Sequence, residues 1–408
     1  MQSKEAKLQA LSPWPKGVNT RLAPTSLPAG TLRSAVNVDI DSTGRIRRRQ
    51  GYRRLLAGQA HSLWANPDYL LCVLDGDLVR ANPDLPETTL IRAKVGADPI
   101  SYAQVANLLY YTSRTVRGRL DLYTGTHYAG FAPPNPEGSP TLTAATAGMA
   151  AGVYQVVLTY VSELGEESGA GLADTIELTG GQGIRLTNIP QGDAARIRVY
   201  CSTPNGDKLF RQTEVGMGTT ELILSSFVRG KQLSTQFLEP LAEGDLLRYF
   251  RGRLYCVDGP VIWHSQPIHY GLHAPDDDYL PPFAADVTLL EAVEDGLYVG
   301  SGGTWFLQGS GPADFVLRFL GAETPIPGTG LTLPAELIDP QLTGRAAYWL
   351  TADGPCLALP GGVLRYPTRD SLPGFSATSG VSGLLRDGGI DRVVTCLTDA
   401  SVRSTFGT

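Results

Sequence analysis

The stretch "DYLLCVLDGDLVRANPD" (residues 68–84) contains an apolar strand, an Asp-Gly turn and a second strand in direct succession. An Asp-Gly pair favours a two-residue hairpin turn, because that turn needs positive φ angles and glycine adopts them without steric cost. The same order recurs in "LLRYFRGRLYCVDGPVIWHSQP" (246–267), "LLEAVEDGLYVGSGGTWFLQGS" (289–310) and "GRAAYWLTADGPCLALPGGVLRYP" (344–367). This repetition predicts many short antiparallel strands joined as hairpins.

The spacing of these segments favours one architecture. Their starts, together with those of residues 100–125 and 383–400, lie roughly 30 to 60 residues apart once an inserted segment is set aside, near the roughly 40 to 50 residues of one four-stranded propeller blade. We therefore predict an all-β fold, a β-propeller of about five to seven blades. A β-sandwich or a solenoid is the alternative, since both use the same turns.

Composition supports short strands and argues against several classes of protein. The 408 residues include 47 glycines and 29 prolines, both of which break long helices. The net charge of −6 argues against a protein that coats nucleic acid, because such proteins carry a basic face. The sequence has no run of about 18 apolar residues and no apolar leader, so we expect neither a membrane span nor export.

The five cysteines lie far apart, each in a strand-like run, and none has the CxxC spacing typical of metal or redox sites. We therefore predict buried free thiols and folding in a reducing compartment. The cysteines are Cys72, Cys201, Cys256, Cys356 and Cys396.

A middle segment has a different pattern. Residues 138–236 contain about seven strand-like runs over about a hundred residues, the size of an immunoglobulin-like sandwich. The Cys…Trp…Cys pattern of antibody domains is missing, which favours a fibronectin type III-like module. The predicted domains are an extended arm with a β-hairpin (1–57), a first propeller part (58–137), the inserted sandwich (138–236) and a second propeller part (237–408).

The segment "NVDIDSTGRIRRRQGY" (37–52) is unusually charged for an acidic chain. Alternating Val38, Asp39, Ile40 and Asp41, a "DSTG" turn and then alternating arginines predict a β-hairpin with acids opposite arginines. A two-stranded ribbon buries too little to be stable alone, so we predict that it packs on another subunit. The predicted interface residues are Asp39, Asp41, Arg45, Arg47, Arg48, Arg49, Arg53 and Arg54. The alternative is that Arg45, Arg47 and Arg49 pair only with the acids of their own hairpin.

Residues 16–55, "KGVNTRLAPTSLPAGTLRSAVNVDIDSTGRIRRRQGYRRL", resemble the opening of many structural proteins of tailed bacteriophages, in which a G-x-N segment leads to an N-V-D-x-D hairpin. "AGVYQVVLTYVSELGEESGAG" (151–171) resembles the fibronectin-like insertion of those proteins. "FRGRLYCVDGPVIWHSQP" (250–267) resembles one of their later blades. The resemblance covers roughly residues 16–330 and concerns architecture rather than catalysis.

This resemblance implies a tail nozzle or tail-tube-like protein of the virion, made in the cytoplasm of the host bacterium. Such a subunit forms a homo-oligomeric ring, commonly a hexamer, which extends the DNA channel. Its partners are the portal and adaptor proteins on one side and distal tail proteins on the other. Genomic DNA passes through without specific binding. The alternative function is a tail module that binds glycan on the host surface.

The candidates for chemistry are few. "WHSQPIHYGLHAPDDDY" (263–279) contains three histidines and three acids, but its spacing matches no known zinc pattern. We expect a solvated loop there, and a calcium site is the lesser alternative. The candidate ligands are His264, His269, His273, Asp276, Asp277 and Asp278.

"SGGTWF" (301–306) is similar to the Asp-box of sialidases but has no aspartate, and no paired catalytic carboxylates can be placed around it. We expect Thr304 and Trp305 to lie in an ordinary blade turn. No phosphate-binding loop is present either. We predict that the protein is not an enzyme and has no catalytic residues, cofactor or metal.

Overall fold

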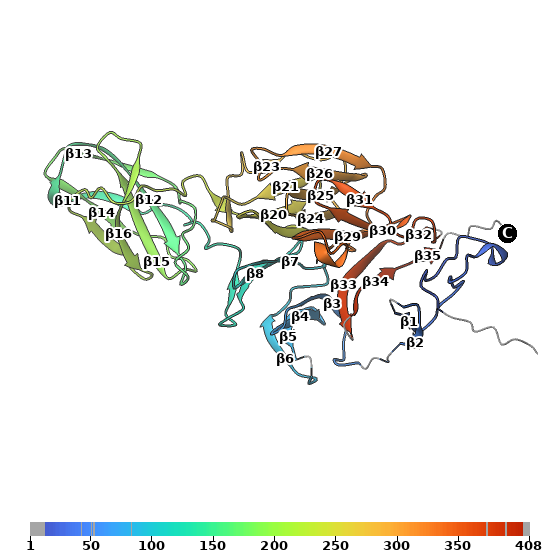
Figure 1. The fold of residues 1–408 in the computed structure, drawn as a ribbon. Coiled ribbons are helices and arrows are strands. Elements are labelled where there is room, and N and C mark those ends of the chain that lie inside the picture. Colours follow the sequence, from blue (N-terminus) through green and yellow to red (C-terminus); the bar gives the residue numbers. More distant parts are fainter. Residues whose placement is uncertain are drawn as a thin grey trace, which may run out of the picture. The chain divides into compact units, whose positions relative to one another are not determined.

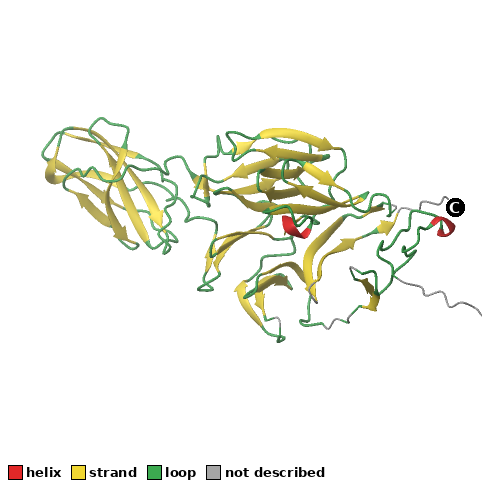
Figure 2. Ribbon diagram, in the orientation of Figure 1, coloured by secondary structure: helices red, strands yellow, loops and turns green. Residues whose placement is uncertain are grey.

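The structure, a computed structural model, describes residues 13–402 except 42, 50, 52, 53, 83, 373, 388 and 389. The described residues are strands and loops with two short 3-10 turns, η1 (Pro24–Ser26) and η2 (Ala335–Leu337) (Figure 2). The predicted all-β class is confirmed: the chain is a series of many small antiparallel sheets. In the part of the chain that is described, no helix is long and apolar enough to cross a membrane.

Five four-stranded sheets form the main series, and strands that are consecutive in the sequence pair in each of them, with one short strand skipped (Figure 1). The first is β3 (Ala60–Ala65), β4 (Leu70–Leu74), β5 (Asp77–Ala81) and β6 (Thr88–Arg92). The second is β7 (Ser101–Val105), β8 (Leu108–Thr112), β9 (Arg117–Asp121) and β10 (His127–Ala129). The third is β19 (Leu246–Phe250), β20 (Arg253–Asp258), β21 (Val261–His264) and β23 (Tyr279–Leu280). The fourth is β24 (Leu289–Val293), β25 (Gly296–Gly300), β26 (Thr304–Gln308) and β27 (Val316–Gly321). The fifth is β28 (Leu331–Pro334), β29 (Arg345–Thr351), β30 (Gly354–Leu359) and β31 (Val363–Arg365).

Shorter pairings accompany this series. The hairpin of β1 (Val38–Ile40) and β2 (Ile46–Arg48) precedes it. In a further pair, β18 (Glu239–Pro240), which precedes the third sheet in the sequence, pairs with β22 (Leu272–His273), which lies between β21 and β23. After the fifth sheet come β32 (Phe375–Ser376) with β35 (Ser401–Val402), and β33 (Ser379–Asp387) with β34 (Ile390–Thr398).

The chain forms two compact units, Met1–Ala57 with Ala284–Thr408, and Gly58–Phe283. In the second unit, consecutive sheets pack face to face. Val73 and Leu78 of the first sheet share a buried cluster with Tyr111 of the second. Tyr110 of the second sheet shares another with Leu254 of the third.

The other unit repeats this arrangement. Tyr298 and Phe306 of the fourth sheet pack with Trp349 of the fifth. Tyr348 of the fifth sheet belongs to a cluster against which Leu384 of β33 packs. All five residues of both β24 and β25 are buried, so these two strands are covered on both faces.

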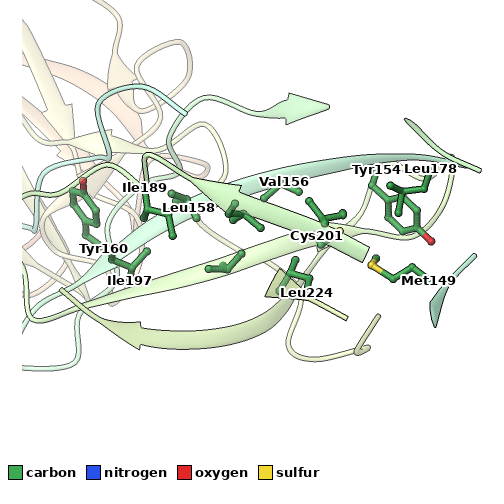
Figure 3. Packing of buried hydrophobic residues seen from close by; sticks show 13 residues of the cluster. Met149, Tyr154, Val156, Leu158, Tyr160, Leu178, Ile189, Ile197, Cys201 and Leu224 are labelled. Atoms are coloured by element: carbon green, nitrogen blue, oxygen red, sulfur yellow. The ribbon is translucent and has the colours of Figure 1, made fainter. Parts of the chain in front are cut away.

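Residues 141–224 form a separate sandwich. Its strands are β11 (Thr141–Met149), β12 (Gly152–Val161), β13 (Asp174–Leu178), β14 (Gln182–Thr187), β15 (Arg196–Ser202), β16 (Leu209–Gly216) and β17 (Glu221–Leu224). They form a three-stranded sheet, β11-β14-β17, and a four-stranded sheet, β13-β12-β15-β16. Figure 3 shows side chains such as Met149, Leu158, Cys201 and Leu224 filling the space between the strands. The sandwich lies inside the predicted range 138–236, whose boundaries stay predictions.

The Asp-Gly turns differ from one another. Asp75 and Gly76 have φ values of 52° and 87°, as the predicted two-residue turn requires. In "EDGL", by contrast, Val293 pairs with Gly296, so the turn residues are Glu294 and Asp295. The prediction of an Asp-Gly turn is wrong there. It is also wrong in "VDGP", where Asp258 pairs with Val261, and in "ADGP", where Thr351 pairs with Gly354. Gly296 is needed within the strand instead, because a Cβ atom at this position would lie 2.2 Å from the carbonyl oxygen of Leu307.

All five cysteines are free, and four of them are buried. The prediction of a buried thiol is wrong for Cys396, which is exposed. The reason is that β34 packs through one face only. Val393 and Leu397 contact the cluster around Tyr348, whereas Val394 and Cys396 alternate with them and lie on the opposite face.

We expect Gly296→Ala to lower the free energy of unfolding by about 1 to 3 kcal/mol, because the new methyl group overpacks a central strand. Gly311→Ala is the matched control, since nothing lies within 4 Å of a Cβ atom there. Chemical denaturation of the two variants and the wild type measures the difference. Equal midpoints for all three proteins would contradict the packing described.

Candidate interface on the arginine hairpin

The β1–β2 hairpin is amphipathic. Val38 pairs with Arg48, Asp39 with Arg47 and Ile40 with Ile46. Residues that face each other across an antiparallel pair lie on the same side of it. One face therefore carries Val38, Ile40, Ile46 and Arg48, and the other carries Asp39 and Arg47.

Asp41 stabilises the turn. Its Oδ1 accepts hydrogen bonds from the Thr43 hydroxyl (2.6 Å), the Thr43 N–H (2.9 Å) and the Arg45 N–H (3.0 Å). The hydrogen bond from the Thr43 hydroxyl is the largest of the effects that lower the pKa of Asp41. The backbone N–H of Trp14 donates to the Gly44 carbonyl at 2.7 Å, so the preceding segment covers this turn. Asp41 therefore acts as a turn residue in this chain rather than as a partner for an arginine side chain of the opposite strand.

The arginines project into solvent. In the described part of the hairpin one ion pair forms, between Arg49 Nε and Asp39 Oδ1 at 3.1 Å, and the Arg49 side chain is still 63% exposed. Arg45, Arg47 and Arg48 are exposed, and so is Arg54, whose Nε donates to the Leu56 carbonyl. Arg53 lies outside the described residues. Pairing within the hairpin thus accounts for one arginine, and most of the positive surface faces outward.

The arm before the hairpin is folded onto its own chain, where the sequence predicted an extended arm. The Asn19 N–H donates to the Leu32 carbonyl and the Leu32 N–H to the Gly17 carbonyl, both at 2.8 Å. Thr20 N–H donates to the Ser371 carbonyl at 2.9 Å, and Arg21 Nη1 donates to the Arg369 carbonyl. Proline and glycine turns allow this doubling back, and the contacts near residue 370 anchor the arm.

The segment 263–279 differs from the solvated loop that we expected. His264, His273 and Asp278 are buried, whereas His269, Asp276 and Asp277 are exposed. Asp278 accepts hydrogen bonds from the Ala274 N–H (2.7 Å) and from Gln266 Nε2. The expectation was therefore wrong for three of the six residues, because Asp278 satisfies the donors of a tightly folded connection.

Burial favours the neutral form of both buried histidines. Burial lowers the pKa of His264, an effect that the nearby Asp278 carboxylate opposes. Burial also lowers the pKa of His273, whose Nδ1 lies 3.2 Å from the Glu239 carbonyl oxygen. Neutral His264 thus contributes stability above its unfolded-state pKa, and this contribution is lost as the pH falls toward the folded-state pKa. Among the residues that the structure describes, no three His, Cys, Asp or Glu side chains are grouped to hold a metal ion.

Thr304 and Trp305 lie at the start of strand β26, so the expectation that they lie in a blade turn is wrong. Thr304 Oγ1 donates to the Glu323 carbonyl, and Trp305 Nε1 donates to the Ser301 carbonyl, both at 2.9 Å. Every side-chain hydrogen bond named here goes to backbone, which is typical of a structural role.

Sequence reasoning missed two polar centres around the turn "SELGEES" (162–168). Glu167 Oε1 accepts the hydroxyls of Thr159 (2.7 Å) and Tyr200 (2.6 Å). Glu167 Oε2 lies 2.8 Å from Arg198 Nη1. The neighbouring Glu166 pairs with the buried Arg119. Two adjacent glutamates between apolar strands were the only signal, and they do not identify partners more than 30 residues away.

No known protein family matches the chain, and no curated protein matches it. Among solved structures, the computationally designed Ika8 protein is similar at 14% identity and a TM-score of 0.27, over 85% of this chain and 96% of that one. BBS1N in complex with ARL6DN is similar at 10% identity and a TM-score of 0.33, over 85% and 91%. The N-terminal domain of Nup159 is similar at 11% identity and a TM-score of 0.27, over 82% and 72%. TM-scores in this range do not establish a shared fold.

We expect Thr43→Val to raise the pKa of Asp41 toward its ordinary value, because the variant loses the hydroxyl donor. In the wild type, stabilisation of the turn by the carboxylate is present above the unfolded-state pKa and is lost as the pH falls through the lowered folded-state pKa. A ¹³C NMR titration of the aspartate carboxyl groups measures both values. An unchanged Asp41 pKa in the variant would count against the hydrogen bond.

We expect Asp278→Ala to lower the free energy of unfolding by about 1 to 3 kcal/mol, because it leaves buried donors without a partner. Asp277→Ala removes an exposed neighbour with the same charge and should change stability by less than about 0.5 kcal/mol. Chemical denaturation compares the two. Equal effects of both substitutions would show that Asp278 does not organise the segment.

Proposed function

We propose that this protein is a structural subunit of the tail of a tailed bacteriophage, a nozzle-like component that forms a homo-oligomeric ring. The ring would extend the DNA channel and link the portal and adaptor side to distal tail components. The observation that carries this proposal is the β1–β2 hairpin, because a small amphipathic ribbon with outward arginines is suited to bind another subunit. The resemblance of residues 16–55 to phage structural proteins gives the proposal its direction.

The finer architecture belongs to this proposal. Each compact unit contains three sheets that pack face to face in chain order, with β33–β34 as the last of them. We propose that these sheets are blades of a β-propeller of about five to seven blades, with β33–β34 as the smallest of the blades described. The sandwich would then be a fibronectin-like insertion between the second and third blades. A closed circle of sheets provides a rigid body for a ring subunit.

Genomic DNA would pass through the ring without specific binding. Each neutralised phosphate adds affinity through counterion release, so arginines that bound DNA would slow its passage. The net charge of −6 favours weak repulsion of DNA instead. The hairpin arginines are therefore assigned to protein partners.

The alternative, a module that binds host glycan, has less support. Glycan platforms need aromatic faces that are open to solvent. Trp349 is buried, and the other four tryptophans are only partly exposed. The tryptophans therefore give little support to this alternative.

The decisive measurement is the mass of the assembly formed by the purified chain, alone and mixed with portal–adaptor complexes. We expect a ring of about six copies, formed either by the purified chain alone or after the adaptor is added. A chain that stays monomeric in both mixtures would overturn the proposal. Selective binding on a glycan array, without assembly, would favour the alternative.

We expect the triple variant Arg47→Ala, Arg48→Ala, Arg49→Ala to remain folded and to be excluded from the ring, because it removes the charge of the proposed interface. The matched control replaces three arginines outside the hairpin, Arg185 and Arg196 of the sandwich and Arg229 of the segment that follows it, and should assemble normally. Native mass spectrometry measures ring formation, and circular dichroism checks folding. Normal assembly of the hairpin variant would remove the hairpin from the interface.

A further inference from the structure

Arg119 is a buried charge in the middle of a sheet. It lies in β9, opposite Tyr110 of β8 and Tyr128 of β10, and its side chain is 2% exposed. The Tyr128 ring lies 5.3 Å from the guanidinium carbon. A buried guanidinium is unfavourable unless an acid pairs with it, so its partner has a large effect on the local structure.

That partner is Glu166, from the turn after β12 of the sandwich. Arg119 Nη2 donates to Glu166 Oε2, and the same oxygen lies 3.3 Å from the Ser162 hydroxyl. Arg119 Nε and Nη1 are buried without a hydrogen-bond partner. The carboxylate of Glu166 is therefore the acid that pairs with the buried Arg119 guanidinium.

Hydrogen bonds hold the turn that carries Glu166 and fix it to the sandwich. The Ser162 N–H donates to the Glu166 carbonyl at 2.9 Å, and the Glu166 N–H donates to the Ser162 hydroxyl at 3.2 Å. The next residue, Glu167, binds Thr159, Arg198 and Tyr200 of the sandwich sheet. The two adjacent glutamates thus join one turn to two different sheets.

Close backbone contacts lie just beyond the turn. The Ala170 N–H donates to the Thr235 carbonyl at 3.2 Å, and Asn135 Nδ2 donates to the Leu238 carbonyl at 2.9 Å. A Cβ atom at Gly169 would lie 1.8 Å from the Leu238 carbonyl oxygen. Both chain connections of the sandwich, before β11 and after β17, therefore meet the segment that follows Glu167.

We propose that the Arg119–Glu166 pair is a latch that fixes the sandwich on the β7–β10 sheet. While the latch is closed, the turn, the two connections and β9 form one rigid neck. The Glu166 side chain is one-third exposed, so water is available to replace Arg119 as its partner. When the ion pair breaks, the sandwich moves on its two connections. The latch thereby sets the direction in which the sandwich projects.

Glu166→Gln tests the latch, and Glu163→Gln is the matched control because it removes the same charge from an exposed position of the same turn. Spin labels at Tyr123→Cys and Lys208→Cys, in a Cys396→Ser background, report the distance between the β9–β10 turn and the sandwich. We expect one narrow distance distribution for the wild type and the control, and a broad one for Glu166→Gln. The Ala170 amide should also exchange at least about tenfold faster in Glu166→Gln.

A second pair of variants keeps the test valid if Glu166→Gln folds poorly. Arg119→Met removes the buried charge while retaining an apolar side chain of similar length, a type of replacement that is often tolerated. It should broaden the distribution as Glu166→Gln does, and adding Glu166→Gln to it should cause no further change. A narrow distribution in both single variants would overturn the latch and assign the rigidity to backbone packing. All measurements use the isolated chain, so they do not depend on ring formation.

Discussion

Burial of the small sheets against their neighbours in the chain is the constraint on which this fold depends. A sheet must bury its apolar face against another element, and here the neighbouring sheets provide the cover. Tyr110 and Tyr111 show how this is done, since adjacent residues of β8 belong to two different buried clusters. The second sheet is therefore covered by the first sheet and by the third.

The sequence was sufficient to predict the elements that depend on local chemistry. The hairpin at residues 37–49 and the Asp75–Gly76 turn follow from alternation and from the φ angles that glycine permits. Gly296 was placed in the wrong role, because the constraint on it comes from the Leu307 carbonyl of a neighbouring strand. Composition cannot distinguish a glycine needed for a turn from one needed for close packing.

Burial of polar groups was harder to predict than secondary structure. Asp278 looked like one of three equivalent acids, yet it alone among them folds inward to accept buried donors. Arg119 gave no signal at all, because its partner Glu166 is remote in sequence and belongs to a different sheet. In both cases the deciding contact is tertiary, and the local pattern does not contain it.

The bond between Thr20 and Ser371 has a consequence for biosynthesis. This hydrogen bond joins residue 20 to residue 371, so the arm cannot make the contact until residue 371 has been translated. A chain that terminates before residue 369 lacks this anchor, however well its earlier sheets have folded. Such a truncated chain lacks the contact that holds the arm preceding the arginine hairpin.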